Sequence, residues 1–239
     1  MDKTLIVTGG SRGIGAEIAH RAAKAGYAVC LTYHSNQSAA DQVVVAIKEK
    51  GGNALAVKVD VAIEADILNL FKIVDAQLPP LKALINNAGI LETHTSVENM
   101  TFDRLQRVLM TNVTGSFLCA REAVLRMSIK HGGTGGGIVN ISSVAASMGS
   151  PHEYVDYAAS KGAIDSFTIG LAKEVAEQGI RVNAVRPGVI YTDIHALGGE
   201  PGRVDRVKDV VPMKRGGEPR EVADAALWLL SNEASYITG

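Results

Sequence analysis

The chain has 239 residues, of which 46% are apolar and 21% charged, and its formal net charge is -1. This length suits one domain with a full core, and the balanced charge, without a run of Lys or Arg, argues against nucleic acid or a membrane surface as a partner. The N-terminus leads directly into a strand-like segment, and no apolar run could span a bilayer. Cys30 and Cys119 show neither disulfide nor metal-ligand spacing. We therefore expect a cytoplasmic protein with two reduced, buried thiols and no metal.

Short apolar runs alternate with amphipathic stretches along the whole chain. The runs are almost continuously apolar, as in strands that are covered on both faces. This alternation predicts an α/β fold with a parallel sheet between two layers of helices, and the absence of a linker or repeat predicts a single domain over residues 1–239. The predicted strands are Thr4–Thr8, Tyr27–Tyr33, Ala54–Val59, Ala83–Asn86, Gly137–Ser142 and Ile180–Val185, the predicted helices include Ile14–Ala25, Ser38–Lys50 and Ala65–Ala76, and Ser235–Gly239 look like the approach to one more strand.

A glycine-rich segment, residues 8–15 (TGGSRGIG), joins the first predicted strand to the first predicted helix. Its G-x-x-x-G-x-G spacing is a variant of the dinucleotide-binding fingerprint. Glycines let the backbone turn tightly and let a pyrophosphate approach the helix N-terminus, where free N–H groups and the helix dipole attract an anion. An ordinary glycine-rich turn is the alternative, but the position between the first strand and the first helix favours nucleotide binding. The candidate contacts are Gly9, Ser11, Arg12, Gly13, Ile14 and Gly15.

The end of the second predicted strand bears on the choice between NAD and NADP. A chain that binds NAD usually carries Asp or Glu about 20 residues after the glycines, where it holds the ribose 2′-hydroxyl. Here Tyr33 is followed by His34, Ser35 and an asparagine, and no carboxylate occurs before Asp41. Arg12 in the loop could instead grip a 2′-phosphate through its guanidinium. We therefore predict a preference for NADP(H), with His34 and Ser35 beside the phosphate.

Tyr157 and Lys161 are four residues apart and lie on one face of a predicted helix. A phenol has an ordinary pKa of about 10, and a fixed ammonium beside it favours the phenolate. We therefore expect Lys161 to lower the pKa of Tyr157 and to make it a usable acid and base. Because this spacing is also common on solvated helix faces, the pair indicates catalysis only in combination with other motifs.

The order and spacing of several motifs resemble those of the short-chain dehydrogenase/reductase family over nearly the whole chain. Besides the glycine-rich loop and the Tyr157/Lys161 pair, these motifs are Asp60-Val61, Asn86–Gly89, Asn112, Ser142-Ser143 and Pro187–Thr192. The resemblance implies a Rossmann fold, which is a doubly wound parallel sheet in a three-layer αβα arrangement. It points to the branch that includes 3-oxoacyl-[acyl-carrier-protein] reductases and glucose dehydrogenases. It implies hydride transfer between nicotinamide C4 and a carbonyl or alcohol carbon.

The resemblance also implies cofactor contacts beyond the glycine-rich loop. Asp60 and Val61 would contact the adenine, although Asp60 could equally cap the next helix. Asn86–Gly89 would lie at the carboxyl end of the fourth strand, mainly as a brace for the sheet, with Asn87 as the contact to the cofactor. The remaining implied contacts are Ala88, Gly89, Tyr157, Lys161, Pro187, Gly188, Ile190 and Thr192.

Four catalytic residues are implied by the same resemblance. Tyr157 would be the general acid/base, and Lys161 would tune it and hold the nicotinamide ribose. Ser143 would hydrogen-bond the substrate oxygen, and Asn112 would fix a water that connects Lys161 to solvent. Ser143 is preferred to its neighbour Ser142 because small apolar residues follow it, and Ser142 is expected to satisfy backbone groups at the strand end.

The segments around the implied substrate are less informative. Ser143 and Tyr157 are one residue further apart than is commonest in the family, and we expect the loop Ser150–Tyr154 to bulge and absorb the difference. A loop from about residue 190 to 211 is expected to cover the substrate as a mobile lid. His195 in that loop is expected to be solvated, and His152 and Tyr154 are weaker candidates for contact with a small carbonyl or alcohol substrate.

The resemblance implies a homotetramer, with a dimer as the alternative. The predicted helix Ala163–Val175 supports self-association, because its apolar residues cover more of its circumference than one contact with a sheet requires. The leading functional hypothesis is an NADP(H)-dependent oxidoreductase. A catalytically silent NADPH-binding regulatory protein of the same fold is the alternative. A sugar-nucleotide epimerase is disfavoured, since the chain has no room for a larger substrate domain.

Overall fold

Six parallel strands form one sheet, in the order β3-β2-β1-β4-β5-β6, in a computed structural model that describes residues 1–239. The strands are β1 (Thr4–Val7), β2 (Ala28–Tyr33), β3 (Ala54–Lys58), β4 (Leu81–Asn86), β5 (Gly136–Ile141) and β6 (Ile180–Val185). Every predicted strand is present, and each bound lies within two residues of its expected place. The predicted parallel sheet is therefore confirmed.

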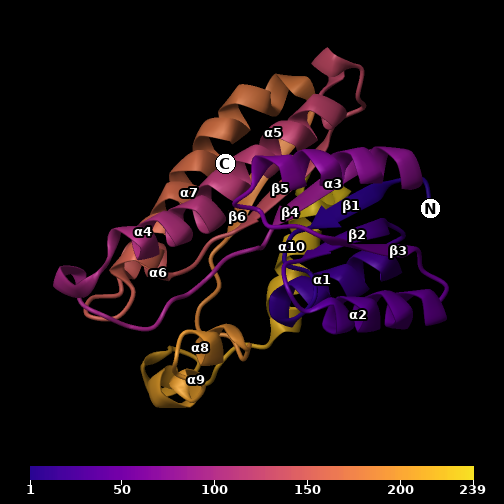
Figure 1. The fold of residues 1–239 in the computed structure, drawn as a ribbon. Coiled ribbons are helices and arrows are strands. Elements are labelled where there is room, and N and C mark those ends of the chain that lie inside the picture. Colours follow the sequence, from indigo (N-terminus) through magenta and orange to yellow (C-terminus); the bar gives the residue numbers. More distant parts are fainter.

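Helices cover both faces of this sheet (Figure 1). One layer contains α1 (Gly13–Lys24), α2 (Gln37–Glu49) and α10 (Pro219–Leu230), and the other contains α3 (Glu64–Gln77), α5 (Gly115–Met127) and α7 (Val155–Val175). Side chains alternate along a strand, so Leu5 and Val7 enter the core under the first layer while Ile6 enters the core under the second. The expected three-layer αβα arrangement of a Rossmann fold is confirmed.

Local sequence signals explain where several helices begin. The side chain of Asn36 accepts the N–H of Ala39 and so caps α2. At the start of α10, Pro219 occupies the first turn and the carboxylate of Glu221 accepts the N–H of Glu218 at 2.8 Å. The side chain of Thr101 caps α4 (Phe102–Leu109).

Helix α4 continues into α5 through a π-helical turn, Met110–Thr114. A π turn inserts one extra residue into a helix, and such turns occur often at functional sites. Here the turn contains Asn112, which is 1% exposed. No sequence pattern predicted this irregularity.

The remaining elements are short. They are α6 (Ala145–Met148), α8 (Ile194–Leu197), α9 (Arg203–Val207) and the 3₁₀ turns Val97–Asn99, Ile129–His131, Ala176–Gln178, Lys208–Val210 and Asn232–Ala234. The last residue, Gly239, donates its N–H to Val182 of β6 at 2.8 Å, so the segment expected to approach a further strand does lie along the edge of the sheet. None of the helices combines the length and the apolar character needed to cross a membrane.

Both cysteines are fully buried, in agreement with the expectation from the sequence. Burial raises the pKa of Cys30 and of Cys119 to about 12. The thiolate forms are therefore scarce, and neither side chain is suited to redox chemistry.

The strand order reverses between β1 and β4, which are neighbours in the sheet although β2 and β3 lie between them in the sequence. In open parallel sheets the crevice at such a reversal, outside the carboxyl ends of the strands, is where ligands bind. The turns that follow β1, β4 and β5 meet at this edge.

Candidate active site

The glycine-rich loop after β1 has the geometry of an anion-binding turn. Gly9 and Gly13 adopt φ angles of 64° and 52°, which disfavour a side chain. A Cβ at Gly15 would lie 2.6 Å from Asn87 Nδ2, so only glycine permits this close approach of the loop to the turn after β4. Helix α1 starts at Gly13 without a side-chain cap, which leaves N–H groups free at its N-terminus. The loop therefore fits a pyrophosphate.

Thr8 and Asn87 hold the glycine-rich loop against the turn after β4. Asn87 Nδ2 donates to the carbonyl oxygens of Thr8 at 2.9 Å and of Gly9 at 3.1 Å. In return Thr8 Oγ1 accepts the N–H groups of Asn87 and Ala88, each at 3.0 Å. The amide of Asn87 is thus occupied as a brace for the loop, and the sequence did not single out Thr8 as its partner.

The residues expected near the 2′-phosphate lie at the carboxyl ends of β1 and β2. Arg12 is exposed, and no carboxylate pairs with its guanidinium. His34 is also exposed, and its Nε2 lies 3.6 Å from Asp60 Oδ2. Ser35 is exposed beside it. A free guanidinium and an imidazole at this edge suit a phosphate dianion.

Asp60 does not cap the next helix, which was one of its two expected roles. Helix α3 begins at Glu64, and Asp60 Oδ1 instead accepts the N–H of Ala62 in a tight turn. Val61 is 6% exposed and packs against Gly115, so its side chain belongs to the core rather than to an open face. Any contact of Val61 with an adenine would come from its backbone.

Tyr157, Lys161 and Ser143 come together where β5 ends and α7 begins. Lys161 Nζ lies 5.5 Å from the centroid of the Tyr157 ring and donates to the carbonyl of Ile141 at 2.7 Å. Ser143 Oγ accepts the N–H of Ala145 at 3.1 Å. Its neighbour Ser142 is buried and donates to the carbonyl of Lys161 at 3.2 Å, which is the strand-end role expected from the sequence.

The structure reverses the expected shift of the Tyr157 pKa. Burial raises the pKa of Tyr157 to about 12, and a contact with the Ser143 hydroxyl opposes this rise only in part. Burial also lowers the pKa of Lys161 to about 8, against the charge of Asp165. Desolvation disfavours the charged form of both groups. The expectation that Lys161 brings the pKa of Tyr157 below 10 is therefore wrong for this structure.

Asn112 is held by the segment after β4 and by α7. Its Oδ1 accepts the N–H of Ile90 at 2.8 Å, and its Nδ2 donates to the carbonyl of Ile90 and to Ser160 Oγ, both at 3.1 Å. A Cβ at Gly89 would lie 3.3 Å from Asn112 Oδ1 and 3.7 Å from Lys161 Nζ. Gly89 therefore keeps the space between these two side chains open.

The turn after β6 closes the site on its third side. The carbonyl of Pro187 accepts the N–H of Val144 at 3.0 Å, which places this turn beside Ser143. Ile190 is 9% exposed, while space is open next to Gly188. Thr192 reaches back to the phosphate loop, since a Cβ at Gly13 would lie 3.2 Å from its methyl group. The predicted cofactor and catalytic residues thus share one edge of the sheet.

Comparisons with known proteins agree with this arrangement. A family model described as Enoyl-(Acyl carrier protein) reductase matches residues 9–239. The oxidoreductase YgfF of Escherichia coli (strain K12), named as uncharacterized, is 59% identical over 234 residues, which cover 98% of this chain and 95% of that protein. Glucose 1-dehydrogenase 2 of Bacillus subtilis (strain 168) is 41% identical over 238 residues, 99% of this chain and 91% of that one. The chain belongs to the short-chain dehydrogenase/reductase family. It is an oxidoreductase.

A solved structure of this family carries a nucleotide. The short chain dehydrogenase of Burkholderia cenocepacia J2315 in complex with NADP superposes with a TM-score of 0.91 at 32% identity, over 100% of this chain and 94% of that one. The family resemblance and the Rossmann fold expected from the sequence are thereby confirmed.

The loop that precedes α7 bulges, as the sequence led us to expect. Ser150 and His152 adopt φ angles of 45° and 62°, in the left-handed region. The carboxylate of Glu153 in this loop pairs with Arg203 at 2.5 Å and with Arg206 at 2.9 Å, both in the segment after β6. His152 itself is exposed.

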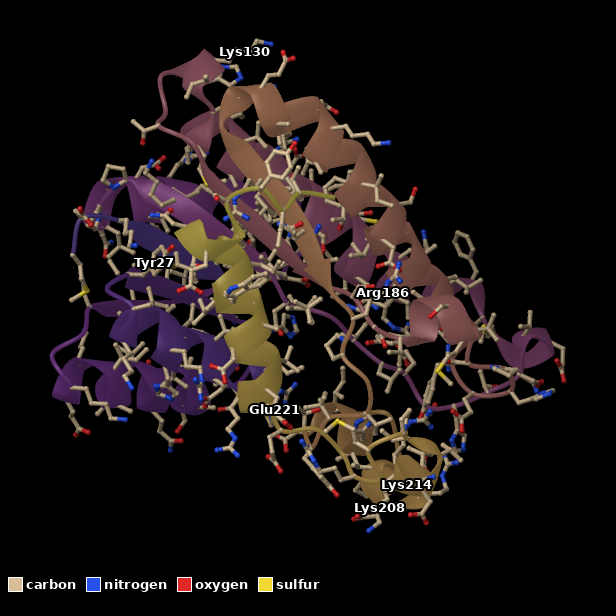
Figure 2. The ribbon with its side chains drawn as sticks, turned by 180° about the vertical axis from the view of Figure 1, so that it is seen from behind. Tyr27, Lys130, Arg186, Lys208, Lys214 and Glu221 are labelled. Atoms are coloured by element: carbon tan, nitrogen blue, oxygen red, sulfur yellow. The ribbon has the colours of Figure 1, made fainter.

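The segment expected to form a lid, residues 190–211, is more structured than the sequence suggested. It contains α8 and α9, and it is closed at its base by parallel pairing of Ile190 with Gly217. Figure 2 labels Lys208 within this segment, Lys214 just after it, and Glu221 in the first turn of α10. Arg203 and Arg206 also pair with Glu200 inside the lid. Ion pairs thus join the lid to the loop before Tyr157.

His195 is not the solvated residue that was expected. Its Nε2 lies 3.1 Å from the carbonyl of Ile190, and its Nδ1 is buried without a partner. Burial lowers the pKa of His195, so the neutral ring is favoured. The side chain therefore ties α8 to the base of the lid.

Proposed function

We propose that this protein is an NADP(H)-dependent oxidoreductase that interconverts a carbonyl group and a secondary alcohol, with Tyr157 as the general acid and base. The observation that carries the proposal is the placement of Tyr157, Lys161 and Ser143 at the same sheet edge as the phosphate loop. The name of the glucose dehydrogenase relative supports a hydroxyl/carbonyl pair as the reacting group. Residues 1–239 would act as one domain, with residues 190–211 as its substrate lid.

The residues of the site fit a dinucleotide with a 2′-phosphate. Gly9, Ser11, Gly13, Ile14 and Gly15 would hold the pyrophosphate at the N-terminus of α1. Arg12, His34 and Ser35 would hold the 2′-phosphate, and the lack of a carboxylate at the end of β2 removes the usual partner of a free 2′-hydroxyl. The NADP of the Burkholderia cenocepacia neighbour supports this choice.

The turns after the other strands would hold the rest of the cofactor. Asp60 and Val61 would flank the adenine, and Lys161 would hold the ribose next to the nicotinamide. When bound, the nicotinamide supplies or accepts the hydride. The other proposed contacts are Asn87, Ala88, Gly89, Tyr157, Pro187, Gly188, Ile190 and Thr192.

In the direction of reduction, Tyr157 would donate its phenolic proton to the oxygen of the substrate carbonyl. Because its pKa is about 12, the phenol is fully protonated at neutral pH and is ready to act as the acid. Ser143 would donate a hydrogen bond to the same oxygen and so hold the carbonyl in place. Asn112, which lies beside Lys161 across Gly89, would hold a water that returns a proton to the site.

A substrate panel tests the proposal. Purified protein is incubated with NADPH or NADH and a range of ketones, aldehydes and sugars, or with NADP+ or NAD+ and the matching alcohols, and nicotinamide absorbance is followed. We expect turnover with NADPH on at least one carbonyl class. Tight NADPH binding without turnover across the panel would instead favour a silent, regulatory protein.

The pH dependence of reduction should report on Lys161. Its ammonium form is present below its pKa of about 8 and is lost above it. Since kcat/KM reflects groups of the free enzyme, we expect kcat/KM for carbonyl reduction to fall as the pH rises through about 8, while Tyr157 stays protonated.

Asp165 provides the control for this profile, because its charge raises the pKa of Lys161. The variant Asp165→Asn should shift the alkaline limb to lower pH. A profile that is flat from pH 7 to 10, or a limb that does not move in the variant, would contradict the role given to Lys161.

We further propose that the protein self-associates, as a homotetramer, through the outer faces of α5 and α7. Phe117 of α5 stacks on Phe167 of α7 with ring centroids 3.7 Å apart, yet Phe117 remains 46% and Ile169 43% exposed. Such an apolar surface on two adjacent helices suits a second copy of the chain. Sedimentation should give the mass of four chains, and the double variant F117K/I169K should give a smaller species. The variant Val45→Lys, on an exposed residue of α2, should leave the mass unchanged.

A further inference from the structure

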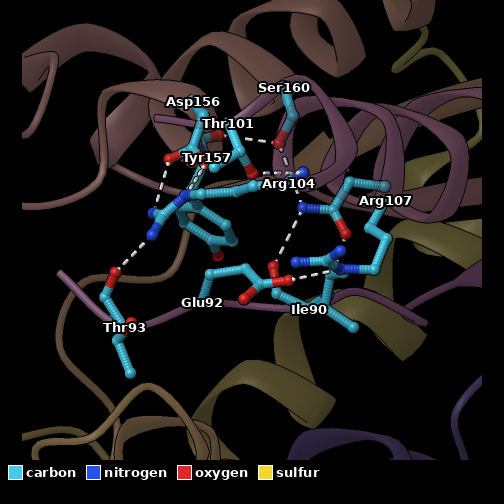
Figure 3. Close-up of polar contacts among 10 residues, drawn as sticks. Ile90, Glu92, Thr93, Thr101, Arg104, Arg107, Asp156, Tyr157 and Ser160 are labelled. Atoms are coloured by element: carbon cyan, nitrogen blue, oxygen red, sulfur yellow. Dashed lines mark hydrogen bonds and ion pairs between the residues drawn. The ribbon is translucent and has the colours of Figure 1, made fainter. Parts of the chain in front are cut away.

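A buried ion pair lies next to Tyr157. Arg104 of α4 and Asp156 at the start of α7 meet in bidentate fashion, with Nε 2.7 Å from Oδ2 and Nη2 3.2 Å from Oδ1 (Figure 3). Their side chains are 8% and 2% exposed. The two residues are 52 positions apart in the sequence, and neither belongs to a motif.

The helix that carries Arg104 also holds the segment that follows β4. Arg104 Nη1 donates to the carbonyl of Thr93 at 2.5 Å, and Arg107 pairs with Glu92 at 2.9 Å. Further along, Asn112 of the π turn bonds both backbone groups of Ile90. Helix α4 and its π turn thus fix the segment 90–93 at three residues, and Figure 3 shows the contacts to Thr93 and Glu92.

The same two elements hold the backbone of Tyr157 from both sides. Asp156 Oδ1 accepts the N–H of Tyr157 at 2.9 Å while it binds Arg104. Ser160 Oγ donates to the carbonyl of Tyr157 at 2.7 Å while it accepts from Asn112. The turn of α7 that carries Tyr157 is therefore attached to α4 before this residue and to the π turn after it.

The segment 90–93 is also the surface on which the lid rests. A Cβ at Gly198 would lie 3.0 Å from Leu91, and a Cβ at Gly199 would lie 3.2 Å from the methyl group of Thr93. Arg104 thus contacts the start of the helix that carries Tyr157. Through Thr93 it also contacts the segment 90–93, on which the lid rests.

We propose that Arg104 is a positioning residue. Through its contacts with Asp156 and Thr93, it fixes the position of the Tyr157 hydroxyl relative to the segment 90–93, on which the lid rests. A buried ion pair contributes little net stability, because desolvation of the two charges offsets their attraction. The contribution of the guanidinium is geometric. Its planar, rigid set of N–H donors makes two hydrogen bonds to the Asp156 carboxylate and a third to the Thr93 carbonyl. This inference rests on the proposed role of Tyr157 as the acid/base.

Kinetic constants of Arg104→Gln, Asp156→Asn and the double variant test the proposal. A small displacement of a catalytic group is costly, so we expect each single variant to lower kcat at least about tenfold. The Kd for NADPH, measured by fluorescence, should stay within a factor of about two, because neither residue touches the phosphate loop. The double variant should lose no more kcat than the more impaired single variant, because both substitutions disrupt the same ion pair.

Arg104→Lys keeps the positive charge but loses the planar guanidinium that binds the carboxylate in bidentate fashion. This variant should therefore fold and still show a clear loss of kcat. The matched control is Arg126→Gln, which breaks a bidentate pair with Asp75 on the outer side of α5 and should keep full kcat even if its Tm falls. Arg104 variants with a lowered Tm and an unchanged kcat would overturn the inference.

The variant Tyr157→Phe separates the two proposals. If it stays active, the proposed role of Tyr157 is wrong. If Tyr157→Phe is inactive while the Arg104 variants are fully active, only the positioning role of Arg104 is rejected.

Discussion

Replacement of Tyr157 by Phe should nearly abolish carbonyl reduction and leave NADPH binding intact. The phenol is the proposed proton donor at the reacting oxygen, and its pKa of about 12 keeps it protonated at neutral pH. A positioned acid contributes a factor of about 10² to 10⁴ to the rate, so kcat should fall by that amount. The Kd for NADPH should change little, because Tyr157 is one of many proposed contacts and the loop that would bind the phosphates stays held by Thr8 and Asn87.

The control for Tyr157→Phe is Tyr27→Phe. Tyr27, labelled in Figure 2, lies just before β2 at the amino end of that strand, and its replacement by Phe removes the same hydroxyl group. This variant should keep full kcat. If Tyr157→Phe retains wild-type kcat with a reactive substrate, another group must supply the proton.

Replacement of Arg12 by Gln should remove most of the preference for NADPH. The exposed guanidinium has no partner in the chain and lies at the N-terminus of α1, where a 2′-phosphate could be bound by charge-assisted hydrogen bonds. Such bonds contribute about 1.5–3 kcal/mol, which corresponds to a factor of about 10 to 100 in affinity. The Kd for NADPH should rise by that factor, whereas the Kd for NADH should change little.

Lys24→Gln is the matched control for Arg12→Gln. It removes one positive charge from the exposed last turn of the same helix and should leave both affinities unchanged. Equal affinity of the wild-type protein for NADPH and NADH would reject the preference itself. A proportional loss of both affinities in Arg12→Gln would show that Arg12 binds the shared pyrophosphate instead.

Long-range ion pairs between the segment after β6 and the loop before α7 have no local signal in the sequence. Glu153, Arg203 and Glu200 carry no spacing that marks them, and the pair between Glu153 and Arg203 spans 50 positions. His195 was expected to be solvated because it lies in a glycine-rich loop that carries two arginines. Only the folded lid brings its ring against the carbonyl of Ile190.

The protonation of Tyr157 and Lys161 shows the same limit in electrostatic terms. Four-residue spacing correctly places Lys161 next to Tyr157, but the sign of a pKa shift depends on how completely each group is removed from water. In the fold, Lys161 is buried and bonded to Ile141, and desolvation dominates for both residues. The direction of the shift could not be obtained from the spacing.

The sequence by itself determined the αβ order, the place of the phosphate loop, the family and the residues at the carboxyl edge of the sheet. These follow from hydrophobic periodicity and short glycine, tyrosine and lysine spacings, which are properties of neighbouring residues. The tertiary structure alone decided which distant groups meet: Arg104 with Asp156, Glu153 with the lid, and Asn112 in a π turn with Ile90 and Ser160. Such contacts depend on the packing of whole helices across the sheet, and no local pattern in the chain encodes them.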